Sequence, residues 1–400
     1  MELDRLYREH APAITSALVK AFGPARLDLI ESAVHEAFVA AIEQWPAGAP
    51  DRPAAWLHTV ARRRLLDALR QAAWFAPDPE LEAVAAPAAD PPIDDDDDLL
   101  KTMLVCCHPT LPIEGALALA LRTLCGLPIA ALARALLVEP AAVEKRLARA
   151  RQALREARID FEPGADVDAR IDAVLRTLYV LFFEGYSAHA GAAQIDDDLC
   201  QTALRLVDLL GRGRYASPAV HALQALFLLQ MSRFAARVDD GGEMVPLDRQ
   251  DRRRWDRAMI ERGLALLATA ARGEVMSPYH LEAAIASCHA LAPTYPDTDW
   301  PRIVGLYDRL LALQPSPVVA LQRAIAVGRA AGPRLGLKAL AVIADDDRLE
   351  ASPVLAAAAA DLKRALGDHR GARVAYRRAL ELAGTEPERR FLGRRLAELA

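Results

Sequence analysis

The sequence lacks the patterns from which β-sheets are built. Alternating runs of Val, Ile, Thr and Tyr are missing, and aromatic residues make up only 6% of the 400 residues. Ala, Leu and Arg recur throughout, and these side chains lose the least freedom on entering a helix. The chain is 53% hydrophobic, which is ample for sizeable cores, and it is too long for one ordinary domain. We therefore expect an all-α protein of two or three domains.

Signals for export and membrane insertion are also missing. The N-terminal segment MELDRLYREHAP is charged and has no apolar core, so it does not resemble a secretory signal peptide. No run of about 18 apolar, uncharged residues occurs, so we expect no membrane span and no membrane partner. The five cysteines are an odd number without the spacing of a disulfide framework. This cysteine usage favours a reduced, cytoplasmic protein.

The familiar motifs of catalysis are absent as well. There is no glycine-rich phosphate loop, no nucleophile elbow and no His-Glu-x-x-His pattern, so we expect neither an enzyme nor a cofactor. Cys106, Cys107 and His108 are adjacent residues without the spacing of zinc ligands. We interpret them as buried structural residues, and we expect no metal site.

The charge that is present is unevenly distributed, although the net charge is only -5. Residues 77–98 contain nine acidic residues and no basic one, and residues 76–98, rich in Pro and Ala, predict a flexible linker. Residues 134–158 contain seven Lys and Arg against three Glu, which is the local positive charge that a DNA contact needs. The predicted organisation is a helical unit over 1–75, the linker, a second unit over 99–160 and a helical array over 166–400.

The segment GLPIAALARALLVEPAAVEKRLARARQALR at 126–155 predicts two helices joined by a short turn. At 100° per residue, the second helix has one narrow apolar stripe, formed by Val143, Leu147, Ala150 and Leu154. Its opposite or flanking faces carry Lys145, Arg146, Arg149 and Gln152, with small Ala residues between them. A basic face with small side chains suits a recognition helix in the major groove. An Arg-rich surface helix of an ordinary bundle remains the alternative.

Two earlier segments predict amphipathic helices. In the helix over 27–45 the buried stripe comprises Ile30, Val34, Ala37, Ala41 and Trp45. In the helix over 54–71 it comprises Leu57, Ala61, Leu65 and Ala68. Arg62, Arg63 and Arg70 project from the opposite side of the second helix, whereas Arg64 falls near its apolar stripe. Basic residues close to Trp74 suit single-stranded DNA, where bases stack on rings, although the spacing alone favours a structural surface helix.

Together, in this order and spacing, the three elements resemble an extracytoplasmic-function sigma factor. IESAVHEAF resembles that family's polymerase-binding helix, RPAAWLHTVARRRLLDALRQ its promoter-melting helix, and the segment at 126–155 its promoter-reading helix-turn-helix. The resemblance implies a role in transcription initiation, with core RNA polymerase and promoter DNA as partners. The acidic stretch at 76–98 falls where the family's linker belongs.

The resemblance also implies roles for individual residues. Polymerase would bind the exposed side of the first helix, at Glu31, Glu36 and Phe38. The minus-10 element would contact Arg62, Arg63, Arg70 and Trp74. The minus-35 element would contact Lys145, Arg146, Arg149 and Gln152. Many family members have Asp and Gln at the positions of Ser32 and His35. They commonly have a hydroxyl and a basic residue at those of Ala142 and Glu144. We therefore expect the detail of the polymerase contact to differ here, and phosphate anchoring to be weaker or the promoter unusual.

The C-terminal half resembles the tetratricopeptide-like extension of one subgroup of these factors. The likeness rests on LVCCHPTLP at 104–112, RIDAVLRTLYVLFFEGYSA at 170–188, LDRQDRRRWDRAMIERGL at 247–264 and later segments. The clearest repeat spans 352–382, where Gly367-Asp368 marks the turn and Ala372, Tyr376 and Ala379 are small, large and small packing positions. Such arrays present a groove, which a peptide, another protein or the N-terminal half could occupy.

Three functional hypotheses follow from the sequence. A sigma factor regulated by its own extension is the preferred one. A helix-turn-helix regulator that does not bind polymerase, and a helical-repeat scaffold whose DNA-binding half has decayed, are the alternatives.

Overall fold

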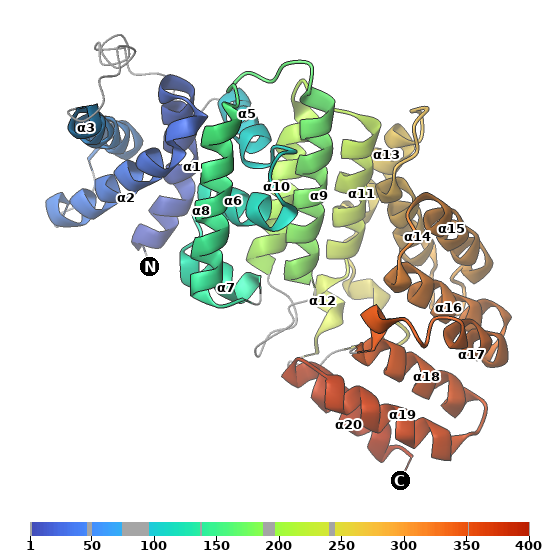
Figure 1. The fold of residues 1–400 in the computed structure, drawn as a ribbon. Helices are drawn as coiled ribbons and strands as arrows, with labels where there is room; N and C mark the ends of the chain where they lie inside the picture. The colour runs from blue at the N-terminus through green and yellow to red at the C-terminus, as the bar shows by residue number, and fades with distance from the viewer. Residues whose placement is uncertain are drawn as a thin grey trace. The chain divides into compact units, whose positions relative to one another are not determined.

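The structure is a computed structural model that describes residues 2–45, 50–73, 96–136, 138–186, 197–239, 245–350 and 352–399 (Figure 1). Every regular element within these ranges is an α-helix or a short 3-10 helix, as the composition predicts. The chain divides into two compact units, Met1–Leu181 and Phe182–Ala400. None of the described helices is long and apolar enough to span a bilayer.

The first unit is a bundle of helices whose buried faces match the predicted apolar stripes. Its helices are α1 (Glu2–Phe22), α2 (Leu27–Gln44), α3 (Pro53–Ala73), α5 (Asp96–Cys106), α6 (Ile113–Cys125), α7 (Ile129–Ala135), α8 (Pro140–Ala157) and the first part of α9 (Val167–Tyr186). The stripes of α2 and α3 pack against each other, and the side chains of Ile30, Ala37, Leu57 and Leu65 are fully buried. Where α2 ends and α3 begins, Trp45 and Trp56 meet edge to face, with ring centroids 5.0 Å apart.

The predicted linker ends earlier than its composition suggests. Residues 74–95 lie outside the described part of the chain, but Asp96, Asp97 and Asp98 already form the first turn of α5. Acidic side chains are favourable there because the helix N-terminus carries partial positive charge. Asp98 is buried and forms an ion pair with Lys20 of α1 at 2.9 Å. The prediction of a flexible linker up to residue 98 was wrong for these three residues, because they start a helix whose Asp98 pairs with a distant lysine.

The boundary between the two units lies inside α9 and not in the segment 160–166. The first part of α9 belongs to the core of the first unit, where the Thr177 side chain contacts the Cys107 thiol. The last turns belong to the second unit, where Phe182 stacks on Phe227 with centroids 4.0 Å apart and rings 6° from parallel. One continuous helix therefore contributes side chains to two cores.

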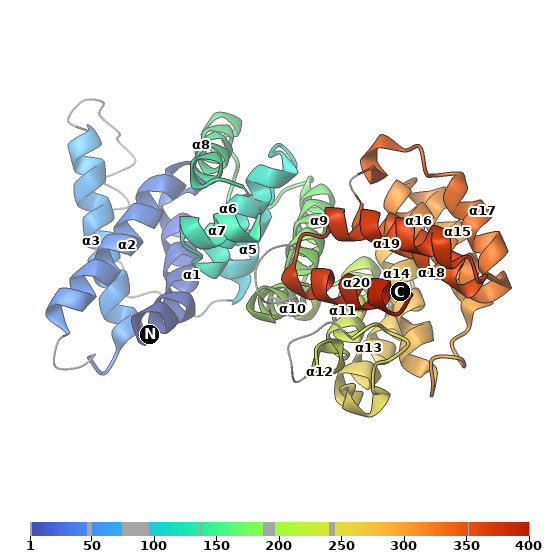
Figure 2. The same cartoon turned by 90° about the horizontal axis from the view of Figure 1, so that it is seen from below.

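The second unit is a series of helix pairs (Figures 1 and 2). Its helices are α10 (Asp197–Arg212), α11 (Pro218–Met231), α12 (Phe234–Arg237), α13 (Arg257–Ala270), α14 (Pro278–Leu291), α15 (Trp300–Leu313), α16 (Pro317–Ala331), α17 (Pro333–Ala341), α18 (Pro353–Ala365), α19 (His369–Leu382) and α20 (Glu386–Ala397). Helices adjacent in sequence pack on each other, as α15 does on α16 and α18 on α19. This is the predicted stacked helical array.

The repeat predicted at 352–382 is the helix pair α18–α19. Gly367 has φ +79°, a left-handed conformation that glycine adopts readily, and the Asp368 side chain accepts a hydrogen bond from the Gly371 amide at 2.8 Å. Ala372, Tyr376 and Ala379 are all buried and pack against Ala360 of α18 and Leu392 of α20. The predicted packing positions are confirmed.

Candidate nucleic-acid interface

The candidate recognition helix is α8, which begins at Pro140 and ends at Ala157. Pro140 occupies the first turn, where its missing N–H leaves no hydrogen bond unmade. Val143, Leu147, Ala150 and Leu154 are buried, as the periodicity predicts. The backbone of α6 approaches closely at Gly115, where an added Cβ would lie 3.4 Å from that of Ala150.

The opposite side of α8 carries the residues expected to contact the minus-35 element. Lys145, Arg149 and Gln152 are exposed and Arg146 is half-buried. Within the described part of the chain, neither the two arginines nor Lys145 pairs with a carboxylate. The Gln152 amide is engaged locally, since its Nε2 donates to Glu156 at 2.5 Å and its Oε1 accepts from Arg155 at 2.7 Å. The three cations are available to an anion, whereas Gln152 must exchange partners to reach a base.

The basic side of α3 is more mixed. Arg63 and Arg70 are exposed and Arg62 is half-buried, while Arg70 also lies 3.5 Å from Asp67. Arg64, expected near the apolar stripe, is exposed and lies 3.8 Å from Glu36 of α2, because its long side chain extends past the stripe to solvent. Trp74 lies outside the described residues. The minus-10 contacts therefore stay a prediction.

Two of the three residues expected on the exposed side of α2 are buried instead. Glu31 is 8% exposed and Phe38 is 2% exposed. Helix α1 covers this face, and the Tyr7 ring packs on Phe38 with centroids 4.7 Å apart. Of the predicted polymerase contacts, only Glu36 lies on the surface. The expected exposure of Glu31 and Phe38 was wrong, because a helix packed on two sides buries more than one stripe.

The exposed face of α2 carries two large apolar side chains that the sequence analysis did not single out. Val39 is 42% exposed and Ile42 is 57% exposed, and Ser32, His35 and Glu36 continue the same face at helical spacing. At 100° per residue, Val39 lies opposite the buried stripe, so its angular position was the available signal. Two exposed apolar side chains at helical spacing add apolar area that a protein contact can bury.

Glu31 is buried where one residue of α6 and one of α8 bind its carboxylate. One oxygen accepts from the Thr123 hydroxyl of α6 at 2.6 Å, and the other accepts from the Arg151 guanidinium of α8. A few residues along, Asp28 and Arg155 form an exposed ion pair at 3.0 Å. Helix α8 thus carries the cations predicted to contact DNA on one side, and it contacts α2 with two arginines on another.

Cys106 and Cys107 are buried at the end of α5, and His108 follows them directly. Within the described part of the chain, no three His, Cys, Asp or Glu side chains gather into a group that could hold a metal ion. Burial raises the pKa of the Cys107 thiol to about 12, so the thiolate that a metal needs is disfavoured. The His108 ring approaches Asp166 at 3.2 Å, and its burial lowers the pKa of the imidazole.

Comparison with known protein families identifies both halves of the first unit. Residues 6–75 match Sigma-70 region 2, and residues 101–154 match Sigma-70 region 4. Residues 170–271 match DUF6596, a family of unknown function. An uncharacterized protein of Rhizobium meliloti (strain 1021) is 40% identical over 400 residues, covering 97% of this chain and 94% of the relative. No solved structure gives a significant match.

The matched segments coincide with structural elements. Region 2 covers α2 and α3, region 4 covers the pair α7–α8 with the basic face, and DUF6596 covers α9 to α13. The order of region 2, region 4 and a helical extension is the one that the sequence resemblance predicts. The chain belongs to the extracytoplasmic-function type of sigma factor, in the form that carries a C-terminal helical extension.

Proposed function

We propose that this sigma factor binds core RNA polymerase through the exposed face of α2 and directs it to promoters through α3 and α8. The observation that carries the proposal is the surface of α8, where Lys145 and Arg149 are exposed without carboxylate partners above a fully buried stripe. Lys and Arg in this position can reach guanine edges or phosphates in the major groove. The polymerase supplies the bond-making chemistry, the chain itself catalyses no reaction, and the site of action is the cytoplasm.

The polymerase contact that we propose differs from the one expected from the sequence. Val39, Ile42 and Glu36 form an exposed patch on α2, which we call the α2 patch. It combines apolar area, which stabilises a protein interface, with one carboxylate, which adds specificity. Glu31 joins this interface only if the contact with Arg151 and Thr123 opens.

The contact between α2 and α8 bears on activity. Regions 2 and 4 must reach two promoter elements at once, and the Glu31–Arg151 pair together with Asp28–Arg155 ties the corresponding helices together. We propose that these ion pairs hold a compact resting form and that promoter binding requires their separation. The free energy needed to separate these ion pairs then lowers the fraction of molecules that can bind a promoter.

We further propose that the C-terminal extension regulates activity. The place of the boundary supports this, because the second unit begins within α9, whose first part belongs to the core of the first unit. For the same reason a deletion from residue 166 would remove part of the first unit's core, including buried Val174 and Leu178. Regulation is therefore better tested by point substitutions than by that truncation.

Binding to purified core polymerase tests the proposed α2 patch. We expect the full chain to bind core enzyme and Ile42→Glu to bind at least tenfold more weakly, because it places a charge in an apolar contact. Val275→Glu in the second unit is the matched control, since Val275 is exposed to a similar or greater degree. If Ile42→Glu binds core polymerase as tightly as the parent chain, the α2 patch is not part of the interface. If the parent chain itself does not bind, the sigma-factor proposal is contradicted.

A further inference from the structure

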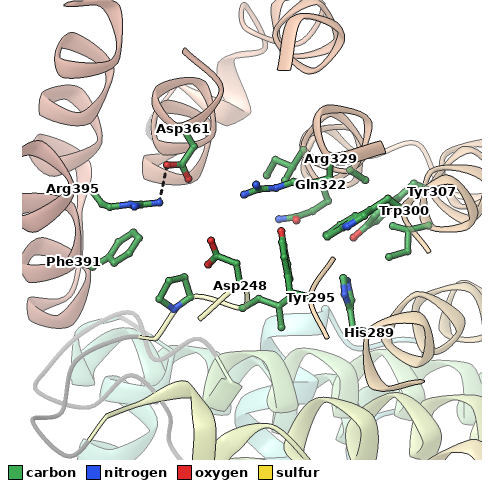
Figure 3. Close-up of a pocket in the computed structure, with 15 residues that line it drawn as sticks. Asp248, His289, Tyr295, Trp300, Tyr307, Gln322, Arg329, Asp361, Phe391 and Arg395 are labelled. Carbon is green, nitrogen blue, oxygen red and sulfur yellow. Dashed lines mark hydrogen bonds and ion pairs between the residues drawn. The ribbon is translucent and has the colours of Figure 1, made fainter. Parts of the chain in front are cut away.

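A cavity of about 230 Å³ lies in the second unit where α14, α15, α16, α18 and α20 converge (Figure 3). The loop segment Pro246–Asp248 closes one side. Residues separated by almost 150 positions in the sequence therefore contribute to a single wall. The volume lies below the roughly 300–1,000 Å³ of pockets for drug-sized ligands, which fits a smaller molecule.

One part of the cavity wall is aromatic. Tyr295 and Trp300 meet edge to face with ring centroids 5.5 Å apart, and His289 also meets Trp300 edge to face, at 5.3 Å. Tyr307 lies beside them, and Phe391 faces the cavity from α20 (Figure 3). These rings offer flat apolar surface to a ligand, with hydroxyl groups at two of the edges.

Another part of the wall is a closed ionic network that holds the helices in place. Asp361 of α18 accepts hydrogen bonds from the Tyr376 hydroxyl and from Arg395 of α20, the latter at 3.3 Å, and Arg395 also donates to Glu398 at 3.1 Å. Arg395 is only 5% exposed, and its Nε is buried without a hydrogen-bond partner. The charges of Asp361 and Arg395 are therefore largely compensated within the wall itself.

Two lining residues of opposite charge remain available. The Arg329 guanidinium of α16 lies over the Tyr295 ring, 5.7 Å from its centroid, and Asp248 belongs to the loop that closes the cavity. Neither forms an ion pair within the described part of the chain. In Figure 3 their side chains approach the central space from opposite sides, with the Gln322 amide next to Arg329.

This arrangement selects against simple ions. An anion drawn to Arg329 meets the carboxylate of Asp248, and a cation drawn to Asp248 meets the guanidinium of Arg329. A molecule that carries both charges satisfies both side chains at once. The aromatic wall then requires an apolar body on the same molecule.

We propose that this cavity binds a free amino acid with a large apolar side chain. Arg329 binds the carboxylate, Asp248 binds the ammonium group, and the side chain packs on Tyr295 and Trp300. The proposal goes beyond transcription initiation, because it concerns the second unit alone. Its test needs no polymerase, so it can fail while the proposed function stands, and the converse also holds.

Isothermal titration of the full chain tests the proposal with L-phenylalanine, L-tryptophan and L-leucine as probes. Two analogues of phenylalanine each lack one charge: 3-phenylpropionate has no ammonium group, and 2-phenylethylamine has no carboxylate. We expect at least one of the amino acids to bind, and both analogues to bind at least tenfold more weakly than phenylalanine. No heat from any amino acid up to about 10 mM, or analogues that bind as tightly as phenylalanine, would overturn the proposal.

Two substitutions assign the charges. Arg329→Ala should weaken amino-acid binding at least tenfold but leave the binding of 2-phenylethylamine unchanged, because that analogue has no carboxylate. Asp248→Asn should also weaken amino-acid binding at least tenfold but leave the binding of 3-phenylpropionate unchanged, because that analogue has no ammonium group. Arg334→Ala is the control, because Arg334 is an exposed arginine of the neighbouring α17 that does not line the cavity. Both substituted positions are exposed, so the fold should persist, which circular dichroism checks. Equal losses with Arg334→Ala would also contradict the assignment.

Discussion

Removing the Arg151 side chain should open the contact between α2 and α8. The Glu31 carboxylate is buried and has two partners, Thr123 and Arg151, of which only Arg151 carries a charge. Arg151→Ala leaves a buried carboxylate with a single neutral donor. The carboxylate regains water only if α2 and α8 separate, so the substitution should favour the separated form.

The size of the effect follows from the burial of the pair. Removing one partner of a buried ion pair costs about 3–5 kcal/mol, which corresponds to a rise of roughly 150- to 5,000-fold in the open population. The pair Asp28–Arg155 offers a control on the same helix, because both of its side chains are about 40% exposed. An exposed pair contributes only about 0.2–1 kcal/mol, so Arg155→Ala should change the open population at most about fivefold.

Hydrogen–deuterium exchange of the full chain measures the opening directly. Peptides that cover α2, α6 and α8 should exchange much faster in Arg151→Ala than in Arg155→Ala. The double variant Glu31→Gln/Arg151→Ala should recover part of the protection, because it no longer buries an unpaired charge. Equal exchange in the two single variants, or no recovery in the double variant, would refute the view that Glu31 and Arg151 hold these helices together.

Further predictions concern the second unit. An added Cβ at Gly336 would lie 2.7 Å from the Gly328 Cα, so Gly336→Ala should destabilise the unit by about 1–3 kcal/mol. Gly305 has open space around it, so Gly305→Ala should stabilise the unit by up to about 1 kcal/mol. If both variants shift the thermal unfolding midpoint alike, the close contact between α16 and α17 is contradicted. Burial, with Arg233 and Arg252 nearby, lowers the pKa of His289 to about 3. The unfolded state therefore binds a proton that the folded state does not, stability falls as pH drops from about 6.5 toward 3, and the loss between pH 7 and 5 is about 2 kcal/mol. Urea unfolding at pH 7 and pH 5 should show that the free energy of unfolding of His289→Gln falls less than that of the parent chain. An equal fall in the variant would mean that the His289 imidazole is exposed to water.

Much of the fold could be predicted from the sequence because helical periodicity is strong in this chain. The stripe at Val143, Leu147, Ala150 and Leu154 is buried as predicted, because a 100° repeat determines which side of a helix can be apolar. The turn at Gly367-Asp368 was also predictable, since glycine adopts positive φ and Asp caps the following helix. These features depend on residues close together in the sequence.

Features that depend on distant residues could not be predicted in this way. Glu31 is buried by Thr123 and Arg151, which lie 92 and 120 positions away, and no local pattern connects them. The end of the linker at Asp96 depends on the ion pair between Asp98 and Lys20, and the division of α9 depends on the partners of Thr177 and Phe182. The cavity in the second unit likewise combines residues from several helices and one loop.

Run-off transcription with purified core polymerase on a library of genomic promoter fragments tests the central claim most directly. We predict promoter-specific transcripts with the full chain, their loss with Lys145→Ala/Arg149→Ala, and their retention with Arg176→Ala, which removes an exposed arginine of α9 from the same unit. The double substitution should leave core-polymerase binding unchanged, because both residues lie on the side of α8 that we propose faces DNA and not on the α2 patch. Transcripts that survive the double substitution at unchanged promoters would contradict the assignment of α8 as the promoter-reading helix.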